Sequence, residues 1–151
     1  MRLALFQPDI PQNVAAIVRL AACLDVPLDI IAPLGFVWDE RKLKRVGMDY
    51  LDAAEITHHT GWQAFLAARN GARIVLLTTK GATPLPSFAF RPDDILLLGR
   101  ESAGVPDDVH AAADARVIVP IRKSTRSLNV AQTAAIAIAE GLRQVGGFPE
   151  V

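Results

Sequence analysis

The sequence has little cysteine, few aromatic residues and no long apolar run. Only one of its 151 residues is a cysteine, Cys23, which excludes an internal disulfide and a cysteine cluster for zinc. A lone cysteine is typical of a reducing compartment, so we expect a cytoplasmic protein. No apolar run reaches the roughly 18 residues that a membrane span requires, and we therefore expect no membrane association.

The chain also lacks an excess of charge of either sign. Its 16 lysines and arginines balance 16 aspartates and glutamates, which is not the composition of a generic polybasic nucleic-acid binder. The positive charges are nevertheless clustered, because four lie between positions 41 and 45 and three between 122 and 126. Both clusters are candidates for contact with an anion. The alternative for each is a solvated surface.

Short apolar runs alternate with helical patterns along the chain. We predict strands at 2–6, 28–32, 73–78, 95–98 and 116–120, and helices at 13–24, 39–46, 62–69 and 129–145. Pro106, Asp107 and Asp108 predict the start of a further short helix. Several strands are apolar throughout, as expected where both faces of a sheet are covered. The alternation indicates the α/β class, with a Rossmann-like parallel sheet, helices on both faces and a single domain spanning residues 1–151.

Unusual residues follow three of these strands. They are the stretch 77–81 (LTTKG), the loop Gly99-x-Glu101-x-x-Gly104-x-Pro106 and the stretch 120–129 (PIRKSTRSLN). Ligands of open α/β sheets bind beyond the carboxyl ends of the strands, where glycines let the backbone come close. Ser127 or Asn129 is placed to cap the last helix. Turn chemistry alone is the competing interpretation of the glycine loop.

Other catalytic classes find little support in the sequence. The glycine loop matches neither a P-loop nor a dinucleotide-binding fingerprint, and no nucleophile elbow is present. His58 and His59 are adjacent, so on a regular element they point in different directions. We therefore expect no metal site, and neither a hydrolase nor a dehydrogenase.

Taken in order, three segments resemble the three motifs of the SPOUT superfamily of RNA methyltransferases. The first is Pro11-Gln12-Asn13 followed by Arg19, the second is the glycine loop, and the third is the stretch 118–121 (IVPI) leading to 127–131 (SLNVA). The stretches 29–43, 46–50 (VGMDY) and 77–81 make the chain similar to the minimal branch without an added RNA-binding domain. The resemblance covers essentially the whole chain.

The resemblance implies a fold, a cofactor and an assembly. The C-terminal segment would form a deep trefoil knot, two chains would form a homodimer through the knot region, and S-adenosylmethionine would be the methyl donor. The implied cofactor contacts are Leu77, Gly99, Val119, Ile121, Ser127 and Leu128.

The resemblance also implies a reaction and a substrate. The methyl group would go to the ribose 2′-oxygen of wobble nucleotide 34, a cytidine or modified uridine, in the anticodon loop of a leucine-type tRNA. Arg19 matches the catalytic arginine, which stays protonated in proteins and is suited to stabilising alkoxide charge and gripping a phosphate. Glu101 would orient Arg19 or a substrate group. The implied positioning residues are Asn13, Glu101, Arg122, Arg126 and Asn129.

Two alternatives stay open at this point. Motifs of this kind predict the reaction better than they predict which RNA nucleotide is modified. The first alternative is therefore methylation of another tRNA position or of an rRNA position. A non-catalytic cofactor-binding module is the second alternative, because Ala15 and Ala139 stand where the family usually has glycine and tyrosine.

Overall fold

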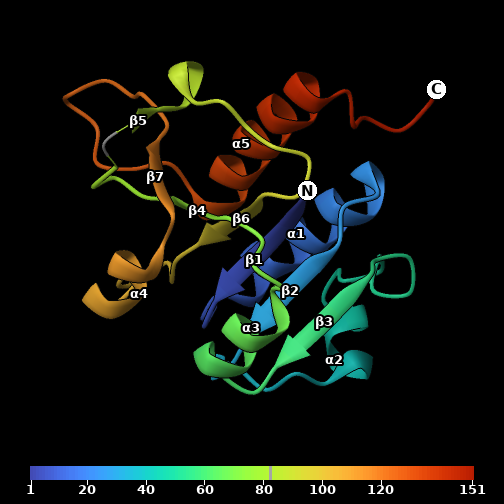
Figure 1. The fold of residues 1–151 in the computed structure, drawn as a ribbon. Coiled ribbons are helices and arrows are strands. Elements are labelled where there is room, and N and C mark those ends of the chain that lie inside the picture. Colours follow the sequence, from blue (N-terminus) through green and yellow to red (C-terminus); the bar gives the residue numbers. More distant parts are fainter. Residues whose placement is uncertain (82) are drawn as a thin grey trace.

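The computed structural model describes residues 1–81 and 83–151 (Figure 1). Within them, seven parallel strands form one sheet in the order β3-β2-β1-β6-β4-β7-β5. The strands are β1 (Arg2–Phe6), β2 (Leu28–Ile31), β3 (Ile56–His59), β4 (Ile74–Leu77), β5 (Thr83–Pro84), β6 (Ile95–Leu98) and β7 (Ala115–Ile118). The helices are α1 (Pro11–Leu24), α2 (Glu40–Arg45), α3 (Trp62–Ala68), α4 (Asp107–Ala112) and α5 (Val130–Val145), with a 3₁₀ turn η1 at Leu85–Ser87.

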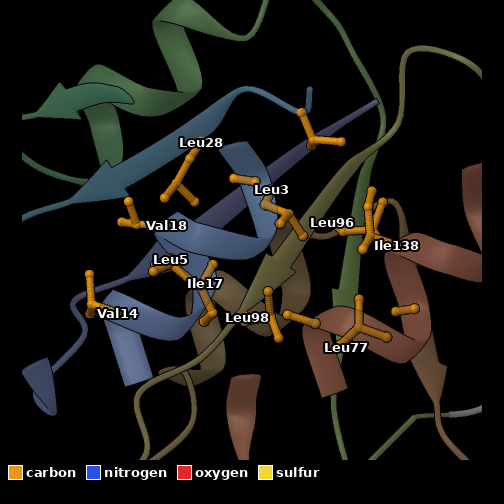
Figure 2. Packing of buried hydrophobic residues seen from close by; sticks show 14 of the residues in the cluster. Leu3, Leu5, Val14, Ile17, Val18, Leu28, Leu77, Leu96, Leu98 and Ile138 are labelled. Atoms are coloured by element: carbon orange, nitrogen blue, oxygen red, sulfur yellow. The ribbon is translucent and has the colours of Figure 1, made fainter. Parts of the chain in front are cut away.

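Helices cover both faces of the sheet, which confirms the predicted α/β class. Strands β4 and β6 are buried along their whole length, as their apolar sequences predict, and β2 is equally buried although it contains Asp29. Residues of α1, α2 and α5 pack on one face, in the cluster drawn in Figure 2, which includes Ile17, Leu98 and Ile138. Helices α3 and α4 cover the other face through Phe65 and Val109.

The predicted elements are present, and two short strands were missed. Strand β3 lies at an edge of the sheet and is half polar, so it lacks the apolar run that marks the central strands. Strand β5 has only two residues and includes a proline. Helix α5 begins as predicted, with Asn129 rather than Ser127 as its N-cap.

His58 and His59 point to opposite faces of β3, as expected for neighbours on a strand. The ring of His58 packs against Trp38, 4.7 Å between centroids. His59 faces the buried carboxylate of Asp29 at 2.8 Å, and Arg2 donates to the same carboxylate at 2.7 Å. The Asp29 charge is therefore compensated inside the fold.

Within residues 1–81 and 83–151, no helix is long and apolar enough to cross a membrane. In the same described part of the chain, no group of three or more histidine, cysteine, aspartate or glutamate side chains is arranged to hold a metal ion.

Candidate active site

A cavity of about 470 Å³ lies at the carboxyl ends of β4, β6 and β7. These three strands are neighbours in the sheet, so the loops that follow them meet at one edge. The residues predicted to contact the cofactor, which are Leu77, Gly99, Val119, Ile121, Ser127 and Leu128, all line this cavity. Asn13, Glu101 and Asn129 line it as well.

The glycine loop is shaped by close backbone contacts. The amide of Arg100 donates to the Gly104 carbonyl oxygen at 2.9 Å, and the Gly104 amide donates back to Arg100 at 2.8 Å. A Cβ atom on Gly99 would lie 2.7 Å from the carbonyl carbon of Gly104, and Gly104 itself has φ of +63°. A side chain at Gly99 would therefore require the Gly104 backbone to move, whereas a side chain at Gly104 has space but would be strained by the positive φ.

Side-chain hydrogen bonds join the three sequence motifs at this cavity. Asn129 Oδ1 accepts from the amide of Ala131 at 2.8 Å and so caps α5. Its Nδ2 donates to Asn13 Oδ1 at 3.0 Å, and Asn13 Nδ2 donates to Glu101 Oε1 at 3.4 Å. The network fixes α1, the glycine loop and the start of α5 relative to one another.

Asp9 and Glu101 form a pair of carboxyl groups at the cavity rim. The amide of Asp9 donates to Glu101 Oε2 at 3.1 Å, and the hydroxyl of Ser102 donates to Asp9 Oδ2. Burial, followed by the nearby Asp9 carboxylate, raises the pKa of Glu101. Hydrogen bonding with Glu101, and next with Ser102, lowers the pKa of Asp9. Glu101 is therefore the group of this pair that takes up a proton first.

Sequence reasoning missed Asp9 and Arg100. Asp9 lies in the sequence Gln-Pro-Asp, directly after the first strand. Its place beyond the carboxyl end of a strand is the sequence feature that could have marked it as a site residue. Arg100 lines the cavity and donates from Nη1 to Gln7 Oε1 at 3.4 Å. Its buried Nε has no hydrogen-bond partner among the described residues.

Arg19, predicted as catalytic, does not line the cavity of its own chain. It lies about 9 Å further along α1 than Asn13 and roughly 120° around the helix. Its side chain is exposed, and its guanidinium carbon lies 4.8 Å from the centroid of the Tyr50 ring. Arg122 and Arg126 are exposed and are likewise absent from the cavity wall.

The fold and the cavity formed by three loops agree with the family to which the chain belongs. This is the SpoU rRNA Methylase family, whose profile matches residues 1–139. A curated relative from Beijerinckia indica is a tRNA (cytidine(34)-2′-O)-methyltransferase. It is 55% identical over 151 residues, which cover 99% of this chain and 94% of the relative.

Solved structures agree with this placement. One, reported as structural insights into the 2-OH methylation of C/U34 on tRNA, has a TM-score of 0.90 and 40% identity. The match covers 97% of this chain and 96% of that one. The SpoU methyltransferase AviRb from Streptomyces viridochromogenes, in complex with AdoMet, has a TM-score of 0.78 at 23% identity. That match covers 96% of this chain and 60% of AviRb, and at this identity it bears on the fold alone.

Proposed function

We propose that the chain is an S-adenosylmethionine-dependent methyltransferase that modifies the ribose 2′-oxygen of nucleotide 34 in tRNA. One observation carries this proposal: three motifs spread along the sequence line one cavity, in a chain 55% identical to a curated enzyme with that activity. We extend it to a cytidine or modified uridine of leucine-type tRNA, in the cytoplasm. The chain acts through this one domain, whose C-terminal segment carries the family's trefoil knot.

The cavity has the chemistry that S-adenosylmethionine requires. Its volume of about 470 Å³ lies within the range of small-molecule sites. Leu77, Val119 and Leu128 offer apolar surface to an adenine ring, and the rigid turn at Gly99 brings main-chain atoms close. These features support binding there.

When bound, S-adenosylmethionine supplies a methyl group already activated by its sulfonium. The chain then has to hold the ribose in line and stabilise the charge that develops on its 2′-oxygen. Asn13 and Asn129 keep the loops in place, while Glu101 presents a carboxyl group to the cavity. Arg19 provides the positive charge for the developing alkoxide.

The position of Arg19 supports a homodimer. Arg19 lies outside the cavity of its own chain, so we infer that it serves the cavity of a second copy. Exposed apolar side chains are available for such contact, because Ile10 beside the cavity is 40% exposed and Ile136 on α5 is 43% exposed. We assign the interface to the knot region that the family resemblance implies.

Two exposed basic clusters are suited to the RNA backbone. Helix α2 carries Arg41, Lys42, Lys44 and Arg45, of which Lys44 pairs with Asp52 at 2.8 Å. Arg122, Lys123 and Arg126 lie on the loop before α5. A two-fold assembly would present each cluster twice, so a dimer whose net charge is zero still offers local positive charge to the RNA backbone.

The test is methyl transfer from labelled S-adenosylmethionine to unmodified tRNA, followed by mass mapping of the product. We expect one ribose methyl group at nucleotide 34, and none from an Arg19→Ala variant that still binds the cofactor. Methylation of another tRNA position or of an rRNA fragment would replace the proposed target. Tight cofactor binding without transfer to any RNA would leave only a binding module.

A further inference from the structure

The guanidinium group of Arg19 is held by an aromatic ring. Its central carbon lies 4.8 Å from the centroid of the Tyr50 ring, within the range of a cation–π interaction. Among the described residues, Arg19 forms no ion pair and no side-chain hydrogen bond. The Tyr50 ring is therefore the contact that restricts this exposed side chain.

Tyr50 is itself fixed by the segment that carries it. Gly47 has φ of +102°, which reverses the chain after α2. Met48, two residues before the tyrosine, is 1% exposed and Leu51, directly after it, is 8% exposed, so the segment is anchored in the core on both sides of Tyr50. The carbonyl oxygen of Tyr50 accepts hydrogen bonds from the amides of Ala53 and Ala54 at 3.1 Å. The ring is thus a rigid platform beside α1.

We infer that Tyr50 is a positioning residue for Arg19, holding the guanidinium in the orientation from which it meets the ribose 2′-oxygen. This inference rests on the proposed function of Arg19. It also gives a role to the 46–50 segment (VGMDY), which lies outside the cavity wall. An arginine that is already oriented loses less side-chain freedom when it reaches the transition state.

The experiment compares four variants. Three are the single substitutions Tyr50→Leu, Tyr50→Phe and Arg19→Ala, and the fourth is a double variant that combines Tyr50→Leu with Arg19→Ala. The control is Trp62→Leu, which removes a half-buried aromatic ring on the other face of the sheet, packed against Phe6 and Phe65. Each dimer is first checked for folding by circular dichroism. The measured quantities are kcat, KM for tRNA and Kd for the cofactor.

We expect Tyr50→Leu to lower kcat about five- to tenfold, in keeping with a single cation–π contact, with KM and Kd little changed. Tyr50→Phe keeps the ring and should restore most of the lost activity. In single-turnover assays with excess enzyme, which record the residual transfer of Arg19→Ala, the double variant should be no slower than Arg19→Ala alone, because Tyr50 acts only through Arg19. Trp62→Leu should keep its kcat. If Tyr50→Leu does not fold, a fluorinated phenylalanine at position 50 keeps the shape, weakens the ring's negative face and should lower kcat.

Three results would overturn the inference. The first is a raised KM for tRNA with unchanged kcat in Tyr50→Leu, which would indicate that the ring contacts RNA directly. The second is a double variant whose loss is the product of the two single losses. The third is full activity of Tyr50→Leu beside an inactive Arg19→Ala. Full activity of Arg19→Ala would instead remove Arg19 from the proposed function.

Discussion

The side-chain amide of Asn129 donates a 3.0 Å hydrogen bond to the side-chain oxygen of Asn13, although 116 positions separate them. The same Asn129 caps helix α5 through its other side-chain atom. One residue thus begins the last helix and fastens it to the first. The cavity lies where these two helices and the glycine loop meet.

Asn129 therefore both caps helix α5 and holds Asn13, and two substitutions distinguish these effects. Asn129→Ala loses the cap and should lower the free energy of unfolding by about 1 kcal/mol. Asn129→Asp keeps a capping oxygen but cannot donate to Asn13, so its stability should stay close to that of the natural chain. We expect both to weaken cofactor binding. Denaturant unfolding and calorimetric titration of the cofactor measure the two effects.

The matched control is Gln132→Ala, an exposed position on the first turn of the same helix. It should change neither stability nor cofactor affinity appreciably. Natural cofactor affinity in Asn129→Asp would contradict a role for the hydrogen bond to Asn13.

Arg19 and the cavity should complement each other between subunits. Gly99→Val places side-chain atoms against Gly104, where even a Cβ lies 2.7 Å from its backbone, so this variant should lose cofactor binding. Arg19→Ala should keep the cavity but lose transfer. If Arg19 serves the partner's cavity, as proposed, a heterodimer of the two contains one intact cavity that faces one intact Arg19. We expect about half the activity of the natural dimer, measured on tag-purified heterodimers.

Each parent homodimer, carried through the same purification, provides the background. An inactive heterodimer would show that Arg19 does not act on the partner's cavity. A Gly61→Ser chain is the control for glycine replacement, because a Cβ at Gly61 meets nothing within 4 Å. It should bind the cofactor normally.

The Asp9–Glu101 pair should give opposite pH dependences of stability. Burial raises the pKa of Glu101 in the folded chain. Its contribution to stability is therefore lost as pH rises from the ordinary glutamate pKa through the raised value. The pKa of Asp9 is lowered by its hydrogen bonds, so its contribution is present above the ordinary aspartate pKa and is lost as pH falls through the folded value.

Denaturant unfolding of Glu101→Gln and Asp9→Asn, across roughly pH 3 to 7, separates the two groups. Relative to the natural chain, Glu101→Gln should gain stability as pH rises and Asp9→Asn should lose it. Curves that run parallel to that of the natural chain would contradict the assigned directions.

The loop before α5 should contribute to tRNA affinity in a salt-dependent manner. Replacing both Arg122 and Arg126 by alanine removes two exposed charges beside the cavity. If each contacts a phosphate, the slope of log affinity against log salt should fall by about 0.7 per contact on single-stranded RNA. Cofactor affinity should not change.

Filter binding at several salt concentrations measures that slope. Arg143→Ala is the control, because Arg143 is exposed near the end of α5 and pairs with Glu140 of its own helix. An unchanged slope in the Arg122/Arg126 variant would remove this loop from the RNA interface.

The sequence by itself determined the class of fold and, through the family resemblance, the six predicted cofactor contacts that line the cavity. Apolar runs marked the central strands because those strands are buried on both faces. The loops at 77–81, 99–106 and 120–129 were recognisable because each follows such a strand. The basic clusters were visible as local charge, although the total charge is zero.

Only the tertiary structure decided which segments become neighbours. Strand β6 inserts between β1 and β4, and β7 inserts between β4 and β5, which brings the three loops to one edge. The link between Asn13 and Asn129, the pairing of Asp9 with Glu101 and the place of Arg19 over Tyr50 all depend on that arrangement. Periodicity reports whether a residue is buried, whereas the identity of its partner depends on how the chain crosses the sheet.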